Sequence, residues 1–443
     1  MARTGPPYER AARWFLVASL GIQALMAGSL GALVALPAGP PSSPAGGWPS
    51  QTGAIEELRI ELAGEPAAAY RTDEPIAPQH RELAAELARR APALAFSSHL
   101  AEAARAYAAA VGHGEHESLP EELLDFTLHW AGAPEPTGLI ALLYTTEESA
   151  ADLWEYLESV LRTAGGRHTH VGIGRAPDTG GRFRTRWGIL LTTRRLALAP
   201  LPRVLEAGRP LELAFELEKN LADPRVVIQE PDGEILQLSL RREAGGWRTS
   251  AELGETRGEV QVEIIASGAR GPDVVALFPV YVAAEPPRAW RGARRLAEDW
   301  VRDPADAERA LAERVNQERL WHGLPPLPLD PDLVAIARCH SLDMRDTAFV
   351  GHISPTAGDL KERLRSAGYS FQYAAENVSK SRGLAEAHAA FLRSPGHRRN
   401  LLTPDASHLG VGVAFGADSS GRRIYFITEV FARPAPLPRP PGG

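Results

Sequence analysis

The chain has 443 residues, which exceeds the size of one ordinary domain and predicts roughly two to four folded units. Apolar residues make up 44% and charged residues 23%, which excludes a largely disordered chain. The net charge of −7 is spread along the sequence without a long basic run, so nucleic acid is not an expected partner.

The first predicted element is an apolar segment, residues 14–36, which contains no charge and follows Arg10 and Arg13. Its 23 residues are enough for a helix across a bilayer of about 30 Å, with residues 1–13 on the cytoplasmic side. A cleaved signal peptide is the alternative, since small residues follow the segment. Either way, the rest of the chain is expected outside the cytoplasm, membrane-anchored or secreted. The basic residues are almost all Arg, which favours a GC-rich bacterial genome.

Next comes a stretch rich in Pro, Gly and Ser, residues 37–52, which predicts a flexible linker. Residues 53–200 then mix helical spacing with short apolar strands, which is typical of an α/β domain. The helical stretches are 100–111 and 150–161, and the strand-like stretches are 171–174 and 187–192.

Period-two alternation marks residues 201–286, where short apolar runs are separated by turns rich in Gly, Pro and Asp. This pattern predicts an antiparallel β-sandwich of immunoglobulin-like type. It contains no catalytic constellation, so a spacer or adhesion role is expected. Residues 287–303 are predicted to be a linker, 304–433 a final domain, and 434–443 a disordered Pro-rich tail. The whole is a multidomain α+β protein.

An internal repeat links the first and last of these domains. THVGIGRAPDTGGRFRTRWGILLTT (169–193) parallels SHLGVGVAFGADSSGRRIYFITEVF (407–431), and LAEAARAYAAAV (100–111) parallels LVAIARCHSLDM (333–344). The parallel predicts that one fold occurs twice.

The last domain carries three short motifs, GHISP (351–355), AENV (375–378) and SPGHRRN (394–400). Ser354-Pro355 and Ser394-Pro395 are each typical of a helix start or a tight turn. His397 then falls in the first turn of a short helix, where the positive end of the dipole disfavours an imidazolium ion. A neutral His near pH 7 can accept a proton or bind a metal.

His352, Glu376 and His397 are candidates for one site, although they lie 24 and 21 residues apart. Only the fold can bring them together. If it does, these side chains suit a zinc site with an open position, or a base with an orienting partner. The same residue types also occur scattered in inert domains, so spacing leaves all of these interpretations open.

The ordered motifs of residues 304–433 are VNQERLWHGLPPLPLDPDLVAIARCHSLDM, GHISP, LKERLRSAGY, AENV, SPGHRRNLL, HLGVGVAF and YFITEVFA. Together they resemble the CAP superfamily, the SCP domain of cysteine-rich secretory proteins, venom allergens and plant pathogenesis-related proteins, and most closely its bacterial, cysteine-free branch. The resemblance implies an α-β-α sandwich whose central cleft holds His352, Glu376 and His397. It places Ser394 and Asn377 in the same cleft.

One feature departs from that family, because many eukaryotic members add a second Glu on the helix before the last His. Here the region is AFLRS, next to Ser394, so the cluster is a triad. Without the second carboxylate, a site for Zn²⁺ or another divalent metal on His352, His397 and Glu376 is the more natural use. Some members of the family bind divalent ions in this cleft, some bind sterols or fatty acids in separate apolar grooves, and proteolysis is proposed only for some, so the resemblance does not imply an enzyme.

Three functions are therefore open. The first is a binding module that recognises a lipid, a cell-wall fragment or a protein, with the membrane contacted through the N-terminal helix. The second is a metal-dependent, peptidase-like hydrolase in which His352, Glu376 and His397 are catalytic. The third is an envelope spacer with an idle triad. Binding is the leading hypothesis, because no nucleophile or oxyanion hole is evident, and an enzyme is not the favoured interpretation.

The remaining polar residues have plainer expected roles. The single Cys339 excludes an intramolecular disulfide and is expected to be buried in a helix. Asn377 and Asn400 are expected to bond backbone groups, His340 to pack or to support the site, and His408 and His170 to share a structural role. Arg398 and Arg399 are expected on a solvated helix face.

The first copy lacks the three motifs and is interpreted as a degenerate CAP-like domain, with a weak metal signal at His113, Glu115 and His116.

Overall fold

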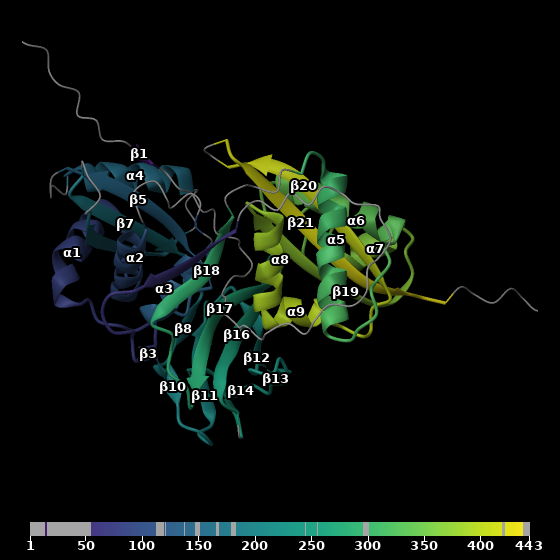
Figure 1. Ribbon diagram of the computed structural model, residues 1–443, viewed down its shortest axis with the longest axis horizontal. Helices are drawn as coiled ribbons and strands as arrows, with labels where there is room; N and C mark the ends of the chain where they lie inside the picture. The colour runs from purple at the N-terminus through teal and green to yellow at the C-terminus, as the bar shows by residue number, and fades with distance from the viewer. Residues whose placement is uncertain are drawn as a thin grey trace, which may run out of the picture.

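The computed structural model describes residues 14–15, 55–111, 119, 121–136, 138–146, 151–164, 168–178, 183–243, 245–254, 256–295, 301–418 and 421–436. Within these residues the chain forms three folded units, shown in Figure 1. We call them the first unit (55–192), the β-sandwich (196–282) and the C-terminal unit (301–436). The β-sandwich lies between and below the other two in that view.

The C-terminal unit is built around a sheet with the antiparallel order β19-β21-β20. Its elements are α5 (Pro304–Trp321), α6 (Pro331–Asp346), α7 (Leu360–Ser366), β19 (Phe371–Ser381), α8 (Leu384–Arg393), α9 (Pro395–Leu401), β20 (His408–Ala417) and β21 (Arg423–Pro434). Asp side chains cap α5, α6 and α7, each accepting a hydrogen bond from a first-turn amide.

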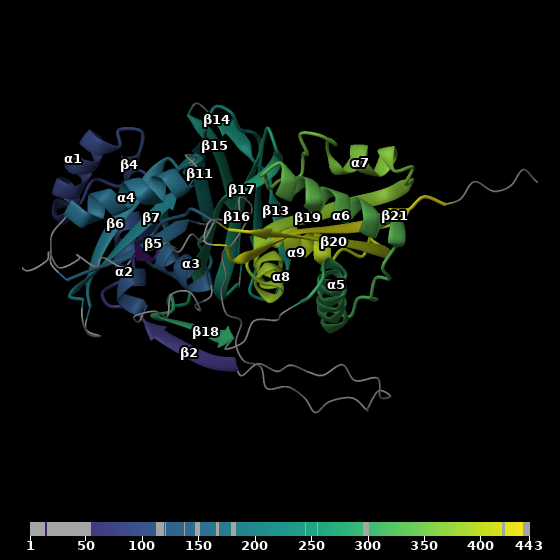
Figure 2. The same cartoon turned by 90° about the horizontal axis from the view of Figure 1, so that it is seen from above.

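Alternation along β21 explains the layers of this unit. Ile427 and Phe431 pack with α5 and α8, whereas Val430 packs with α6 and α7 on the other face. Figure 2 shows α6 and α7 on one side of the sheet and α5 and α8 on the other. The α-β-α sandwich implied by the family resemblance is therefore present.

The first unit has the sheet order β1-β5-β7-β6-β4. Its elements are β1 (Trp14–Phe15), η1 (Pro78–His80), α1 (Arg81–Arg90), β4 (Ala95–Phe96), α2 (Ser98–Ala110), α3 (Glu121–Trp130), β5 (Leu139–Thr145), α4 (Ala151–Ala164), β6 (His170–Pro177) and β7 (Thr185–Thr192). These agree with the predicted helices and strands of residues 100–192. Helices again cover both faces, because α2 and α3 pack on one face of β5-β7-β6 and α1 and α4 on the other.

The first and C-terminal units place a helix against glycines in the same way. A Cβ at Gly172 or Gly174 would overlap with the backbone of α2, and a Cβ at Gly410 or Gly412 would overlap with the backbone of α6. Only glycine allows this close approach of helix and strand. The order of elements, from α1 to β7 and from α5 to β21, is also the same except for β4 in the first unit and α9 in the C-terminal unit.

Strand pairing corrects the predicted match between residues 169–193 and 407–431 in one respect. Gly172 pairs with Leu190, whereas the corresponding Gly410 pairs with Val430. The β20-β21 hairpin of the C-terminal unit is therefore two residues longer than the β6-β7 hairpin of the first unit. After the turn, the ungapped sequence match is shifted by two residues from the structural correspondence. By this register Leu190 corresponds to Val430.

The β-sandwich consists of the sheet β10-β17-β16-β12-β13 packed against the sheet β14-β15-β11-β8 around a shared apolar core. Its strands are β8 (Leu196–Leu198), β10 (Val204–Leu205), β11 (Leu211–Leu217), β12 (Ala222–Gln229), β13 (Ile235–Leu238), β14 (Arg241–Glu243), β15 (Gly246–Ala251), β16 (Gly258–Gly268) and β17 (Gly271–Val282). The alternating runs thus form a β-sandwich as predicted, while its immunoglobulin-like type remains a prediction.

The predicted linker 287–303 contains a strand instead. β18 (Ala289–Arg295) pairs antiparallel with β2 (Ile55–Glu61), and Trp290 is buried against α2 and α3. The basic, Trp-containing sequence looked like a connection, because its partner strand lies more than two hundred residues earlier. A shorter pair, β3 (Ala69–Tyr70) with β9 (Leu201–Pro202), ties the first unit to the β-sandwich.

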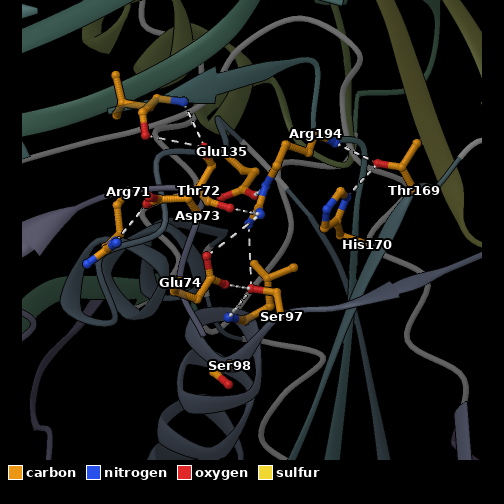
Figure 3. A network of polar contacts seen from close by, with 12 residues as sticks. Arg71, Thr72, Asp73, Glu74, Ser97, Ser98, Glu135, Thr169, His170 and Arg194 are labelled. Carbon is orange, nitrogen blue, oxygen red and sulfur yellow. Dashed lines mark hydrogen bonds and ion pairs between the residues drawn. The ribbon is translucent and has the colours of Figure 1, made fainter. Parts of the chain in front are cut away.

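A buried polar network fixes the segment after β3 to the first unit (Figure 3). The Arg194 guanidinium donates to Glu135 Oε1 at 2.7 Å and to the Thr72 carbonyl at 2.9 Å, and lies 3.8 Å from Glu74 Oε2. Thr169 Oγ1 accepts from the Arg194 amide and contacts His170 Nδ1 at 2.9 Å. The corresponding His408 has the same contact with Ser407, at 3.0 Å, which supports a shared structural role for these His residues.

Several other predictions have different outcomes. Cys339 is exposed, not buried, because the inner face of α6 is formed by Leu333, Ile336, Ala337 and His340. Of the apolar segment 14–36, only β1 is described, and no helix of the described chain is long and apolar enough to span a membrane. The linker 37–52, most of the tail 434–443, and His113, Glu115 and His116 lie outside the described residues.

The helix–glycine contacts predict a paired effect of substitution. Gly412→Ala should destabilise the C-terminal unit, and Gly174→Ala the first unit, by about 3 kcal/mol, because in each case the new Cβ must displace a helix backbone. Scanning calorimetry of the full chain checks this. Gly383→Ala is the control, since the nearest atom to its Cβ would be 3.7 Å away. Equal transition temperatures for all variants would contradict the prediction.

Candidate functional site

The fold brings the three predicted site residues together. His352 Nδ1 lies 3.0 Å from Glu376 Oε2, and the ring centroids of His352 and His397 are 6.5 Å apart. Glu376 and His397 are buried, and the His352 side chain is 20% exposed. GHISP, AENV and SPGHRRN therefore meet in space.

His352 is held by the loop between α6 and α7. Ser354 forms a tight turn with Gly358 rather than a helix start, and the Ser354 hydroxyl accepts from the amides of Thr356 and Ala357. On the other side, the buried His340 contacts the Gly351 carbonyl through Nε2 at 3.0 Å. His340 thus supports the backbone next to His352.

His397 is placed by the predicted helix start. Ser394 is the N-cap of α9, its hydroxyl accepts from the His397 amide at 3.2 Å, and Pro395 follows it. The His397 ring lies edge-on to Phe391, with centroids 5.1 Å apart, and its Nδ1 has no hydrogen-bond partner among the described residues. Burial, with a smaller effect of His352, lowers the pKa of His397 to about 3, so the ring is neutral at physiological pH.

Arg363 of α7 fixes the carboxylate of Glu376. Its guanidinium donates to Glu376 Oε1 and also to the carbonyls of His352 and Gly358, both at 3.0 Å. Burial alone would raise the pKa of Glu376, but Arg363, the His352 hydrogen bond and His340 outweigh it and lower the pKa to about 2. The ionised carboxylate can only accept, so Nδ1 of His352 carries the proton in this contact.

Behind these residues lies a buried chain of amides. Asn400 donates to the Glu376 carbonyl at 3.2 Å and to Asn377 Oδ1 at 3.0 Å. Asn377 donates to the His397 carbonyl at 3.3 Å and to Glu429 Oε2 at 3.2 Å. Both amides bond backbone groups, as predicted. Burial raises the pKa of Glu429 to about 8, and the Asn377 hydrogen bond only partly opposes it.

Sequence reasoning missed two members of this network. Arg363 lies in the charged stretch LKERLRS, and nothing local marks it as buried. Glu429 left a signal, because it is a single charge within the apolar strand YFITEVFA.

Arg398 contacts His322 Nε2 at 2.8 Å, and the exposed Arg399 donates to Gln237 of the β-sandwich at 3.3 Å.

The predicted divalent-metal site does not fit this arrangement as it stands. No group of three His, Cys, Asp or Glu within the described residues is placed to hold a metal ion. Both oxygens of Glu376 are occupied by Arg363 and His352. Tetrahedral zinc on two imidazoles would also bring the ring centroids to about 5 Å, closer than the 6.5 Å between His352 and His397.

The first unit provides an internal comparison for this network. By strand pairing, Ile140, Ala141 and Ile189 occupy the positions of Glu376, Asn377 and Glu429. Ile140, Ala141 and Ile189 are all buried. The shared topology therefore forms with apolar residues at these positions and does not require the polar ones.

Arg363→Ala tests the central ion pair. Removing the guanidinium leaves Glu376 buried without its main partner, so the C-terminal unit should lose about 3–5 kcal/mol near pH 7. Because the pKa of Glu376 is depressed, its contribution is present above its ordinary pKa and lost as pH falls through about 2. The difference between wild type and variant should therefore shrink in acid.

Thermal unfolding at pH 7 and at stepwise lower pH measures this difference. Arg345→Ala is the control, since Arg345 pairs with Asp346 on the surface and should matter little. An Arg363→Ala variant as stable as wild type at pH 7 would contradict the role given to the ion pair.

Known proteins match the C-terminal unit. The model of the CAP family, the cysteine-rich secretory protein family, matches residues 312–431. YkwD of Bacillus subtilis (strain 168) is 40% identical over 106 residues, which are 24% of this chain and 41% of YkwD. The Bacillus subtilis membrane protein YlbC is 36% identical over 119 residues, which are 26% of this chain and 34% of YlbC. The matched regions thus span less than half the length of these relatives.

Solved structures give related matches. An extracellular SCP-domain protein from Bacillus anthracis str. Ames aligns with 23% identity over 44% of this chain and 67% of its own, with a TM-score of 0.27. A cysteine-rich secretory protein from Staphylococcus aureus subsp. aureus Mu50 aligns with 14% identity over 65% of this chain and 97% of its own, with a TM-score of 0.25. From the family match and the two Bacillus subtilis relatives, we conclude that the C-terminal unit of this chain belongs to the CAP superfamily.

Proposed function

We propose that this chain is a bacterial recognition protein that acts outside the cytoplasm and binds a ligand at His352 and His397 of its CAP domain. The apolar segment 14–36 supports this location, either as a membrane anchor or as a cleaved signal. The relatives point the same way, because one is an extracellular protein and another is a membrane protein.

The polar network around the histidines is the first support for a function at this position. Burying Glu376, Asn377 and Glu429 costs free energy, and the first unit shows that the topology forms with Ile and Ala instead. Buried polar residues that destabilise the fold and that the topology does not require are expected where they serve a ligand. We interpret the first unit as a degenerate CAP-like copy with an architectural role.

Binding is favoured over hydrolysis by one observation: the pKa of Glu376 is lowered to about 2 beside Arg363. A general base works best when its pKa lies near the working pH, and His397, with a pKa of about 3, is equally weak. Neutral imidazoles are still good hydrogen-bonding groups, and Nδ1 of His397 has no partner among the described residues. The site therefore suits a ligand rich in hydrogen-bonding groups, and we favour a cell-wall fragment over a lipid.

The double variant His352→Ala/His397→Ala should bind muropeptides from digested peptidoglycan at least about tenfold more weakly than wild type, because it loses two hydrogen-bonding rings. Microcalorimetry on the full chain measures the affinity. His99→Ala is the matched control, since His99 lies on α2 of the first unit. Equal affinity of the double variant and wild type would show that the histidines do not form the binding site. Binding of lipid vesicles in place of muropeptides would show that the ligand is a lipid.

A metal-dependent hydrolase is the second candidate, because the fold does bring the two histidines and Glu376 together. It requires Arg363 to release Glu376. We expect Zn²⁺ titration of the full chain to show no tight one-to-one binding that depends on both histidines. Tight binding that the His352→Ala/His397→Ala variant loses would overturn this expectation and favour the hydrolase.

A further inference from the structure

The β-sandwich contacts both histidine-bearing segments of the CAP domain. At the turn between β16 and β17, the Arg270 carbonyl accepts from the amides of His352 and Ile353, both at 3.0 Å. Farther along β16, Glu263 reaches the start of α9, which carries His397. Figure 1 shows α9 beside β16 and β12 of the β-sandwich.

Glu263 uses both carboxyl oxygens in this contact. Oε1 accepts from the Ser394 hydroxyl at 2.6 Å, and Oε2 accepts from the Gly396 amide at 2.8 Å. The Ser394 oxygen in turn accepts from the His397 amide at 3.2 Å. A continuous chain of hydrogen bonds therefore runs from the β-sandwich to the backbone of His397.

Close packing accompanies these hydrogen bonds. Gly271 has φ +94°, and a Cβ there would lie 3.1 Å from His352 Cβ. A Cβ at Gly351 would lie 2.9 Å from the Arg270 carbonyl oxygen, and one at Gly396 would lie 3.0 Å from Glu263 Oε2. Glycine thus occurs on both sides of the contact wherever a side chain would separate the units.

Burying the Glu263 carboxyl group costs free energy that is not needed merely to attach the β-sandwich to the C-terminal unit. It is fully buried, and burial raises its pKa to about 7 although Ser394, Gly396, Arg225 and Arg399 oppose the shift. The neighbouring contact between the units is apolar, formed by Val227, Ile265, Val274 and Leu277 of the β-sandwich with Ala390 of α8. An apolar side chain would attach the units without burying a carboxyl group.

We propose that the β-sandwich forms a fixed wall of the histidine site and that Glu263 is a positioning residue for His397. Through Ser394 and Gly396 it fixes the first turn of α9, and with it the direction of the His397 ring. Arg270 does the same for the His352 backbone. The inference deepens the proposed function, since it assigns a purpose to the β-sandwich, but its test needs no ligand.

The test is the rate at which diethyl pyrocarbonate modifies each His of the full chain at pH 7.5, followed by peptide mass spectrometry. At this pH His397 is neutral both when buried and when exposed, so its rate reports access rather than protonation. Glu263→Ala should raise the His397 rate at least about tenfold, because α9 loses its anchor on the β-sandwich.

Matched variants separate positioning from general destabilisation. Glu263→Gln can still bond Gly396 and Ser394 and should keep the wild-type rate. Glu259→Gln should also keep it, because Glu259 lies on the same strand but bonds Tyr281. His388, buried on α8, should stay protected in all variants. If Glu263→Ala does not fold, Glu263→Asp, which keeps the charge but shortens the reach, should give an intermediate rate.

Unchanged His397 reactivity in folded Glu263→Ala would overturn the proposal. A parallel rise at His388 would overturn it too, because Glu263 would then contribute only to stability. A selective rise at His397 together with absent muropeptide binding would refute the proposed ligand class and leave the wall in place.

Discussion

The buried ion pair between Arg363 and Glu376 is the interaction on which the histidine site depends. It fixes the carboxylate that orients His352, and the same guanidinium holds the carbonyls of His352 and Gly358. One side chain thus joins α7, β19 and the GHISP loop. The pair also limits the chemistry: the low pKa of Glu376 makes its carboxylate a weak base, and because both oxygens are engaged by Arg363 and His352, neither is free to bind a metal.

The two α/β units show what their common topology requires and what it does not. Glycines that admit a helix against the sheet occur in both, at Gly172 and Gly174 and at Gly410 and Gly412. The buried Glu376, Asn377 and Glu429, by contrast, have apolar counterparts in the first unit. The glycines therefore belong to the fold, and the polar set belongs to the site. The β-sandwich, in contact with both histidine-bearing segments, is best understood as part of the same site rather than as a spacer.

The parts of the fold and of the site that depend on neighbouring residues could be predicted from the sequence. Alternation predicted the strands of the β-sandwich, and Ser394-Pro395 predicted the cap that places His397. What could not be predicted depends on partners far away in the chain. β18 pairs with a strand near the other end of the described chain, and Glu263 meets Ser394 across 131 residues. Cys339 was misplaced because a helix with an apolar pattern still has an outer face, and only packing decides which residues lie there.

Titration of the Glu376 carboxyl group would show directly whether Arg363 holds it in the ionised form. Carbon-13 NMR of the full chain, with Glu376→Gln to assign the signal, would follow its ionisation from neutral pH into acid. If the ion pair holds, the signal should stay at its ionised position until the pH approaches about 2. A midpoint at about 5 or above would contradict it, because the carboxyl group would then be free enough to act as an acid or a base, and hydrolysis would become the better proposal.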